Sequence, residues 1–329
     1  MISVIVTVLN EAETMATLLE SLGMQTRVPD EIIIVDGGSD DGTLDILCRF
    51  QDRLPLRIIR APGTNISQGR NLAIAAAHGD IIVATDAGLY LSPQWLECLV
   101  APFLNDPELH VVGGYAAPDP HSLFEMALGA AVSRLPDEIK PEQLLPGSRN
   151  IAYRKRAWQA VGGYPEWLDF GEDMVFALKL KQLVGRIAYA PSAIIYFRPR
   201  SSLKAFFKMY YHYARGDGKA DLWRKRHAIR YFTYLIAVPG IFLLGAIVHP
   251  LLWTLFPIGG LVYLYHPYRR LWVALRKTQA SLLSMTAAVL MLPIIRLTGD
   301  IAKMIGYPVG LLWRFQRKPP DWRIKEKIV

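Results

Sequence analysis

The feature that most restricts the fold is a stretch of 35 residues, Tyr231 to Tyr265, that contains no Asp, Glu, Lys or Arg. A single helix of this length would measure about 52 Å, whereas the hydrocarbon layer of a bilayer is about 30 Å thick. The pair His249-Pro250 interrupts the stretch near its middle. We therefore expect two apolar spans, at about 230–248 and 250–266, and favour a membrane hairpin over a buried core hairpin.

Basic residues flank this hairpin on both sides: Arg224, Lys225 and Arg226 before it, and Arg269, Arg270, Arg276 and Lys277 after it. Because basic flanks stay in the cytoplasm, both ends of the hairpin are expected there. A third apolar segment follows at about 279–296. Asp300 and Lys303 disfavour full burial of the next segment, at about 298–314, which we expect to be either the return arm of a third hydrophobic hairpin or an interfacial helix.

The charge of the chain limits its possible binding partners, and its cysteine content indicates the redox compartment. The net charge is +8, and Arg198 to Arg230 contains ten Lys or Arg against two acids. Basic stretches beside apolar segments indicate anionic membrane lipid. No recognition-helix, zinc-finger or stacking-module signature supports nucleic acid as a partner. The two cysteines, Cys48 and Cys98, lie in helix-like segments and indicate free thiols in a reducing compartment.

The first 200 residues alternate between apolar strand-like runs and helical patterns. Strands are expected at Ile2–Leu9, Glu31–Val35, Leu56–Arg60 and Ile81–Ala84, with amphipathic helices between them. Nearly continuous apolar strands separated by helices are typical of a parallel sheet covered on both faces. The pattern predicts an α/β, Rossmann-like domain with a mostly parallel sheet, followed by C-terminal transmembrane or interfacial helices.

Polar residues follow the predicted strands where each strand ends. Asn10-Glu11 follows the first strand, Asp36 the second and Thr85-Asp86 the fourth. Ligands of such sheets bind beyond the carboxyl ends of the strands, so these side chains indicate a common site. Taken singly, each is also a normal helix cap or turn residue. The chain has neither a Gly-x-Gly-x-x-Gly fingerprint nor a P-loop, and the stretch from Asp36 lacks calcium-loop ligands.

Five motifs in order resemble the family 2 glycosyltransferases. They are Val-Thr-Val-Leu-Asn-Glu, Ile-Val-Asp-Gly-Gly-Ser-Asp-Asp-Gly-Thr, Gly69-Arg70-Asn71, Thr85-Asp86-Ala87 and Gly171-Glu172-Asp173. The resemblance extends over about residues 1–220. It implies a GT-A fold and an inverting enzyme that takes a sugar from a nucleotide-sugar donor.

The resemblance also implies roles for individual residues. A donor-binding set matches the segments around the nucleotide: Thr7, Leu9, Asn10, Glu11, Asp36, Gly38, Asp41, Arg70, Asp86 and Ala87. Asp86 matches the first acid of the family's Asp-x-Asp and is the expected metal ligand, while Gly88 stands where the second acid would be. Glu172 and Asp173 match the family's acidic pair, in which an Asp serves as general base.

The chemistry of sugar transfer explains these residue types. A nucleoside diphosphate gains negative charge as it leaves, and Mg²⁺ or Mn²⁺ held by one carboxylate can offset this charge. Inversion needs a base that takes the proton of the acceptor, and Asp173 is the candidate. Alternatively, Glu172 and Asp173 are first-turn acids that stabilise the following helix through its dipole.

Two further stretches are candidates for the acceptor or the diphosphate. Ser148, Arg149 and Asn150 lie where the family has an acceptor-side loop, although an ordinary hairpin explains them equally well. Arg215 lies in an aromatic and basic helix, at the place of the Gln-x-x-Arg-Trp motif of membrane-bound synthases, which is absent here. An interfacial helix on lipid headgroups is the simpler alternative.

These features combine into one expectation. Residues 1–200 form the transferase domain, 201–229 a basic-aromatic interfacial region, 230–316 the membrane helices and 317–329 a basic cytoplasmic tail. The enzyme is expected in the cell membrane as a multi-pass protein with a cytoplasmic catalytic domain, acting on a lipid-linked or glycan acceptor in cell-envelope synthesis. The alternatives are a processive polysaccharide synthase and a non-catalytic nucleotide-sugar-binding scaffold, which the missing second acid suggests.

Overall fold

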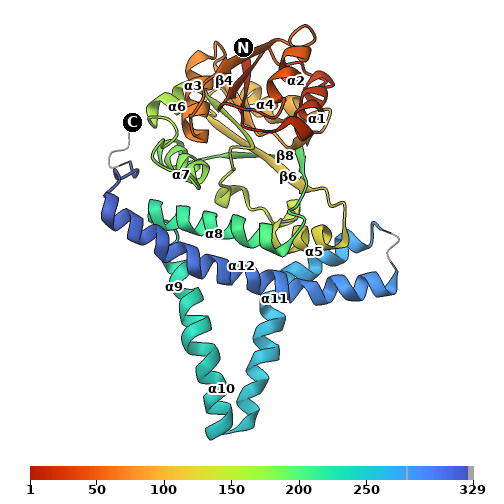
Figure 1. Ribbon diagram of the computed structural model, residues 1–329, viewed down its shortest axis with the longest axis vertical. Helices are drawn as coiled ribbons and strands as arrows, with labels where there is room; N and C mark the ends of the chain where they lie inside the picture. Colours follow the sequence, from red (N-terminus) through yellow and green to blue (C-terminus); the bar gives the residue numbers. More distant parts are fainter. Residues whose placement is uncertain (279–280, 325–329) are drawn as a thin grey trace. The chain divides into compact units, whose positions relative to one another are not determined.

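The computed structural model describes residues 1–278 and 281–324, and the chain divides into two compact units. Unit 1 comprises Met1–Pro118, Leu135–Arg198 and the segment that begins at Pro320. Unit 2 comprises Asp119–Arg134 and Pro199–Pro319. Figure 1 shows the sheet of unit 1 and the long helices of unit 2. The chain therefore passes between the units several times.

Unit 1 is built on an eight-stranded sheet of order β3-β2-β1-β4-β7-β6-β8-β5. β1, β2, β3 and β4 are parallel, as predicted, whereas β7 pairs antiparallel with both β4 and β6. The sheet is therefore mixed. The strands are β1 (Ile2–Val8), β2 (Glu31–Asp36), β3 (Leu56–Arg60), β4 (Ile81–Thr85), β5 (Leu89–Leu91), β6 (Val111–Pro118), β7 (Asn150–Arg154) and β8 (Ala188–Phe197).

Helices cover both faces of this sheet, because alternate strand residues enter two separate cores. Val4 and Val6 of β1 pack with α1 (Ala12–Gly23), α2 (Thr43–Phe50) and α4 (Trp95–Asn105). Ile5 packs on the other face with α3 (Ile66–Ala76), α6 (Lys155–Ala160) and α7 (Glu172–Val184). Short 3₁₀ turns at Pro136–Glu138 and Pro141–Gln143 precede β7. This arrangement confirms the predicted Rossmann-like α/β architecture with helices on both faces.

Local sequence fixes where α3 and α7 begin, and both helices carry candidate site residues. Asn65 and Gln68 form a reciprocal capping box at the start of α3. Gly69 lets α3 approach β1 closely, since a Cβ there would lie 2.9 Å from Cγ2 of Thr7. Gly171 precedes α7 with φ +80°, a conformation that favours glycine. The start of each helix is therefore specified by a few local residues.

Unit 2 is helical. Its elements are α5 (Leu123–Val132), α8 (Leu203–Ala220), α9 (Arg224–Phe232), a π-helical turn (Thr233–Ala237), α10 (Val238–Ile247), a 3₁₀ turn (Pro250–Thr254), α11 (Leu255–Leu275) and α12 (Leu282–Arg317). α8 and α12 lie side by side, while α9–α10 and α11 project from them as a hairpin (Figure 1). A Cβ on Gly306 or Gly310 of α12 would overlap the backbone of α8. Glycine therefore permits the close α8–α12 contact.

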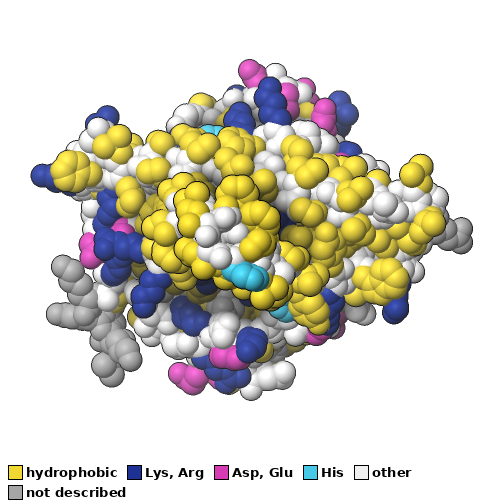
Figure 2. All heavy atoms as spheres, turned by 90° about the horizontal axis from the view of Figure 1, so that it is seen from below, with side chains coloured by type: hydrophobic (Ala, Val, Ile, Leu, Met, Phe, Trp, Pro, Cys, Tyr) yellow, Lys and Arg dark blue, Asp and Glu magenta, His cyan; other side chains and the backbone are white. Residues whose placement is uncertain are grey.

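The hairpin of unit 2 exposes an unusual amount of apolar surface. Its exposed side chains include Leu235, Ile236, Phe242, Ile247, Leu261 and Val262. Figure 2 shows hydrophobic side chains forming a continuous surface on the face viewed. Two described helical segments, Arg224–Ile247 and Leu282–Arg317, are long and apolar enough to cross a membrane. By the same measure α11, which contains most of the second expected span, is not among them.

The C-terminal helices differ from the sequence-based expectation. Separate segments were expected at 279–296 and 298–314, but a single helix, α12, runs from Leu282 to Arg317; residues 279 and 280 lie outside the described part of the chain. Asp300 does not interrupt this helix because Nε of Arg230 donates to it at 2.8 Å and the Tyr234 hydroxyl donates at 3.0 Å. A partnered carboxylate costs far less to bury than a lone one.

Residues 119–134 also differ, because they belong to unit 2 rather than to the expected 1–200 domain. α5 buries Ala127, Leu128 and Ala131 in a core shared with α11 and α12. Its apolar residues leave no wide polar face, so it requires neighbours on several sides. The sequence pattern identified neither this excursion nor its partners, which are more than 100 residues away.

Candidate active site

The residues that follow β1 and β2 form one hydrogen-bonded corner. Asp36, which is fully buried, accepts hydrogen bonds from the backbone amides of Gly38 and Ser39 at 3.3 and 3.1 Å. Asn10 donates its backbone N–H to Ser39 Oγ at 2.9 Å and accepts from the Asp40 amide at 3.0 Å. Asn10 has φ +57°, a left-handed value that Asn tolerates better than most residues. The two strand ends are thereby locked together.

The other residues predicted in this corner have different surroundings. Asp41 accepts from the backbone amides of Ala12 and Thr43 at 3.0 Å and so ties the loop to α1. Glu11 donates its backbone N–H to Thr43 Oγ1 at 2.9 Å. Thr7 packs against α3 at Gly69, whereas Leu9 is exposed. Leu9 therefore presents accessible apolar surface beside these polar groups.

Arg70 of α3 joins two acids that are far apart in the sequence. Its two terminal nitrogens donate to Asp86 Oδ1 and to Glu172 Oε1, each at 2.8 Å. The guanidinium group lies over the ring of Tyr164, 5.3 Å from its centroid. Burial lowers the pKa of Arg70, but the neighbouring acids outweigh this effect and raise it above its ordinary value. Arg70 is therefore a buried, permanently charged clamp.

The acid pair at the start of α7 lies in this network. Burial and the Asp173 carboxylate raise the pKa of Glu172 to about 7, although Arg70 opposes the shift. Asp173 Oδ1 accepts from the Met174 amide at 2.7 Å. Its Oδ2 lies 3.2 Å from where a Cβ on Gly147 would stand. Asp173 thus lies beside the Pro146–Asn150 loop.

The three candidate residues of that loop differ in their exposure to solvent. Ser148 is buried, and its Oγ lies 2.8 Å from the Tyr164 hydroxyl. Asn150 is also buried; it accepts from Trp95 Nε1 at 2.8 Å and donates to the carbonyls of Tyr115 and Ala193. Its amide is engaged within the domain, and its role toward an acceptor or a diphosphate stays a prediction. Arg149 is exposed and stacks on Phe197 at 4.6 Å, so it alone of the three is accessible.

Tyr164 is a site residue that the sequence analysis missed. It lies under Arg70, stacks on Phe176 with ring centroids 3.9 Å apart, and pairs with Ser148. Burial raises its pKa to about 12, so the hydroxyl stays protonated near neutral pH. The sequence signal by which Tyr164 could have been found is an aromatic residue directly after Gly162-Gly163 and shortly before the acid pair.

Gly88, which replaces the second acid, has a conformational role. It has φ +77° in the turn between β4 and β5, where a side chain would be strained. Ala87 is half-buried in the same turn. Glu11 Oε2 lies 3.9 Å from where a Cβ on Gly88 would stand, so the carboxylate of the residue that precedes α1 approaches this turn.

The side chains that could coordinate a metal ion in this site limit how such an ion can bind. Within the described residues, no three or more His, Cys, Asp or Glu side chains are grouped to hold a metal. Arg70 engages one oxygen of Asp86, whose side chain is 34% exposed. Mg²⁺ commonly binds one or two carboxylates together with phosphate oxygens and waters. Asp86 therefore fits a site that the donor phosphates complete.

Arg215 lies apart from this set in sequence and unit. It is on α8 of unit 2, half-buried, with its backbone against Gly306 and Gly310. Its role toward a diphosphate stays a prediction.

Family models match most of the chain. The model of glycosyl transferase family 2 matches residues 3–155, and that of glycosyl transferase family group 2 matches residues 86–296. The chain belongs to glycosyltransferase family 2. It is a nucleotide-sugar-dependent glycosyltransferase, as its five motifs predicted.

Characterised relatives of this family 2 enzyme include proteins of glycan synthesis. The O-antigen chain rhamnosyltransferase RfbN of Salmonella typhimurium is 25% identical over 63% of this chain and 70% of its own. The succinoglycan biosynthesis protein ExoA of Rhizobium meliloti is 27% identical over 78% of this chain and 81% of its own. Two further relatives are matched over less of their own length: the hyaluronan synthase of Pasteurella multocida over 12%, and the O-antigen chain rhamnosyltransferase WbaN of Salmonella anatum over 62%.

A solved structure confirms the fold. The mannosyltransferase of Pyrobaculum calidifontis, in complex with GDP-Man and Mn²⁺, superposes with a TM-score of 0.54 at 18% identity. The match covers 97% of this chain and 88% of that one. The GT-A fold that the family resemblance implied is therefore confirmed.

Proposed function

We propose that this family 2 enzyme transfers a sugar, with inversion, from a nucleotide-sugar donor to a lipid-linked or membrane-proximal glycan acceptor of the cell envelope. The observation that carries the proposal is the chain of contacts from Asp86 through Arg70 to Glu172, next to Asp173. On this proposal Asp86 serves the diphosphate and Asp173 the acceptor, and the contacts of Arg70 support the proposal because they link the segments that carry these two acids.

On this proposal the corner formed by β1 and β2 receives the nucleoside. Asp36 and Asn10, held by the loop at Ser39, shape the pocket for base and ribose. Leu9 supplies exposed apolar surface for the base. Gly38 permits the loop because it has φ +108°, and Asp41 secures the loop against α1.

Asp86 would hold a divalent cation, which neutralises charge on the departing diphosphate when bound. Arg70 keeps Asp86 and Glu172 in place and makes no step of its own. Asp173 takes the proton from the acceptor hydroxyl. The exposed Arg149 beside the same loop is suited to an anionic part of the acceptor or donor.

Unit 2 supplies the membrane attachment in this proposal. The apolar hairpin from α9 to α11 and the basic residues at its ends suit insertion from the cytoplasmic side of an anionic membrane. Anchoring concentrates the enzyme where a lipid-linked acceptor lies. ExoA and RfbN, whose names connect them with polysaccharide synthesis, support an envelope acceptor.

The test is a transfer assay with full-length protein in membranes. Radiolabelled UDP-, GDP- and dTDP-sugars are supplied with Mn²⁺ and a total lipid extract, and the anomeric configuration of the product is read by NMR. Transfer to lipid with inversion supports the proposal. Retention of configuration, or no transfer from any donor to lipid or added glycan, would refute it.

A further inference from the structure

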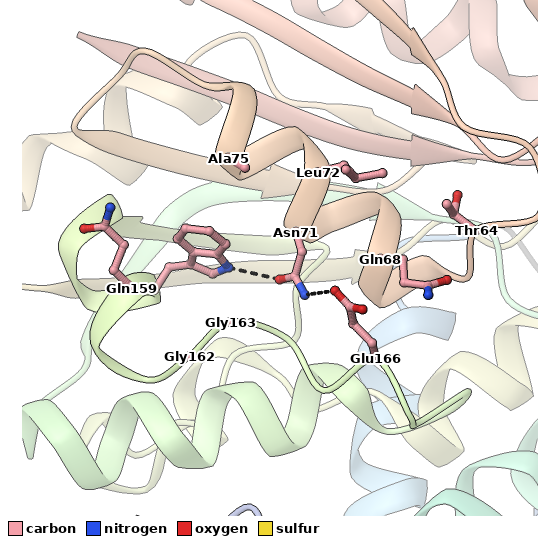
Figure 3. Close-up of a pocket in the computed structure, with 10 residues that line it drawn as sticks. Thr64, Gln68, Asn71, Leu72, Ala75, Gln159, Gly162, Gly163 and Glu166 are labelled. Atoms are coloured by element: carbon pink, nitrogen blue, oxygen red, sulfur yellow. Dashed lines mark hydrogen bonds between the residues drawn. The ribbon is translucent and has the colours of Figure 1, made fainter.

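A groove with a cavity volume of about 690 Å³ lies on unit 1, outside the Asp86–Arg70–Glu172 network. Figure 3 shows that Gln68, Leu72 and Ala75 of α3 form one wall and that Gln159, Gly162 and Gly163 face them. Its volume is in the range of small-molecule sites.

This groove is lined by a mixture of apolar and polar side chains, and none of these side chains is positively charged. Leu72, 42% exposed, and Trp158 provide apolar surface, and Gln68, Gln159 and Glu166 provide amide and carboxylate groups. None of the ten residues that line the groove is Lys or Arg. Such a lining does not suit a phosphate or nucleotide, which requires positive charge or clustered backbone amides.

The same lining suits a neutral ligand with many hydroxyl groups. Side-chain amides donate and accept hydrogen bonds, and a carboxylate accepts two or more, as ligand hydroxyls require. Apolar side chains between them cover the C–H faces of a sugar ring. We propose that the groove binds a neutral stretch of the acceptor glycan, away from its reacting end; this inference rests on the proposed function.

The walls of the groove are held in place before any ligand binds. Asn71 donates to Glu166 Oε1 at 2.9 Å and to the Tyr164 carbonyl at 3.0 Å, and its Oδ1 accepts from Trp158 Nε1 at 3.1 Å (Figure 3). Asn65 donates to the Glu166 carbonyl at 2.7 Å. A rigid groove loses little conformational entropy on binding, which favours weakly held neutral ligands.

A glycine completes this rigid wall. Gly163 has φ +67°, and a Cβ there would lie 2.8 Å from Asn71 Oδ1. Only glycine therefore allows the turn that brings Trp158 and Glu166 to Asn71.

The groove and the acid site share their supporting elements. Arg70 and Asn71 are consecutive on α3, about 100° apart around the helix, so one faces the acids and the other the groove. Glu166 lies six residues before Glu172 on the segment leading into α7. A glycan in the groove would therefore be held by the same helix and segment that position the acids.

The test measures glycan binding to the full-length protein without donor. The protein is kept in an amine-oxide detergent, because maltoside detergents carry sugar headgroups. Maltohexaose, cellohexaose, mannohexaose and a rhamnose hexasaccharide are titrated by calorimetry against wild type, Ala75→Trp, Gln159→Ala and the control Leu104→Trp. Leu104 is an exposed α4 residue on the other face of the sheet, and melting temperatures check the folding of each variant.

At least one hexasaccharide is expected to bind wild type and Leu104→Trp alike, at least tenfold more weakly to Ala75→Trp, and severalfold more weakly to Gln159→Ala. Absence of binding to wild type at millimolar concentration, binding that Ala75→Trp does not weaken, or displacement by UDP or GDP would overturn the proposal. Because no turnover is needed, binding without transfer would refute the proposed function alone, and transfer without binding would refute the groove alone.

Discussion

Arg70 shows how one residue can hold two acids of a site together. Its buried guanidinium group contacts Asp86 and Glu172 at once, and of the two acids only Asp86 is partly exposed to solvent. Removing one partner of a buried pair leaves an uncompensated charge, which costs several kcal/mol. Loss of any one partner of this cluster should therefore destabilise the domain, and Arg70 orients the two acids together.

Glu172 predicts a pH dependence of stability. Its pKa is about 7 in the folded enzyme and near 4.5 when unfolded, so between these values the folded state holds a proton that the unfolded state has released. The contribution of Glu172 is fully present below about pH 4.5 and is lost as the pH rises through 7. The melting temperature of Glu172→Gln, relative to wild type, should rise between pH 5 and pH 8. A difference that stays constant would contradict the shifted pKa.

Asp86 predicts a metal dependence of activity. In Asp86→Asn, donor turnover should fall by about 100-fold or more and lose its stimulation by Mn²⁺, because the carboxylate proposed to hold the cation is gone. Asp80→Asn is the matched control, since Asp80 precedes the opposite end of the same strand and is exposed. Turnover is measured as free nucleoside diphosphate over a Mn²⁺ titration. Unchanged stimulation in Asp86→Asn would show that the cation binds elsewhere.

At the scale of elements, the sequence predicted what depends on local pattern. The strands β1 to β4 end within one residue of their expected limits. The reason is that a run of β-branched residues specifies each strand and the polar residues directly after it specify where the strand ends. The pairing of Arg70 with Glu172, 102 residues away, was not predictable, since no periodicity encodes which buried charges meet. α12 was expected as two segments because Asp300 was considered without its partner Arg230.

The α8–α12 contact predicts different effects for two glycines. Gly310→Ala should destabilise unit 2 by about 1–3 kcal/mol, because its Cβ would overlap the Arg215 carbonyl oxygen. Gly260→Ala on α11 meets nothing within 4 Å and should be neutral or stabilising by about 0.5–1 kcal/mol. Melting temperatures in detergent compare the two variants. Equal effects would mean that the glycines matter through helix propensity alone.

At the scale of the whole molecule, the catalytic unit is not one continuous segment. The chain leaves unit 1 after Pro118, returns at Leu135 and leaves again after Arg198. Residues 1–198 alone would thus expose α5, whose apolar residues normally pack on α11 and α12. Contiguous sequence boundaries, such as the expected 1–200 domain, could not reveal this.

Truncation tests this organisation. Residues 1–198 should aggregate, whereas the same fragment with 120–134 replaced by a Gly-Ser linker should give more soluble monomer, because the exposed apolar helix is gone. Gel filtration of the two fragments, expressed under identical conditions, measures the difference. A monodisperse 1–198 fragment with α5 present would show that α5 needs no partner.

The central claim is that Asp173 is the general base of a glycosyltransferase, rather than only a first-turn acid of α7. Its direct test compares sugar transfer and nucleotide affinity in wild type, Asp173→Asn and Asp45→Asn. Asp45 is the exposed first-turn acid of α2, so its variant loses the same helix-dipole interaction. We predict that kcat of Asp173→Asn falls by about 100- to 10,000-fold, with nucleotide Kd nearly unchanged and Asp45→Asn close to wild type. Transfer by Asp173→Asn at the wild-type rate would contradict the account.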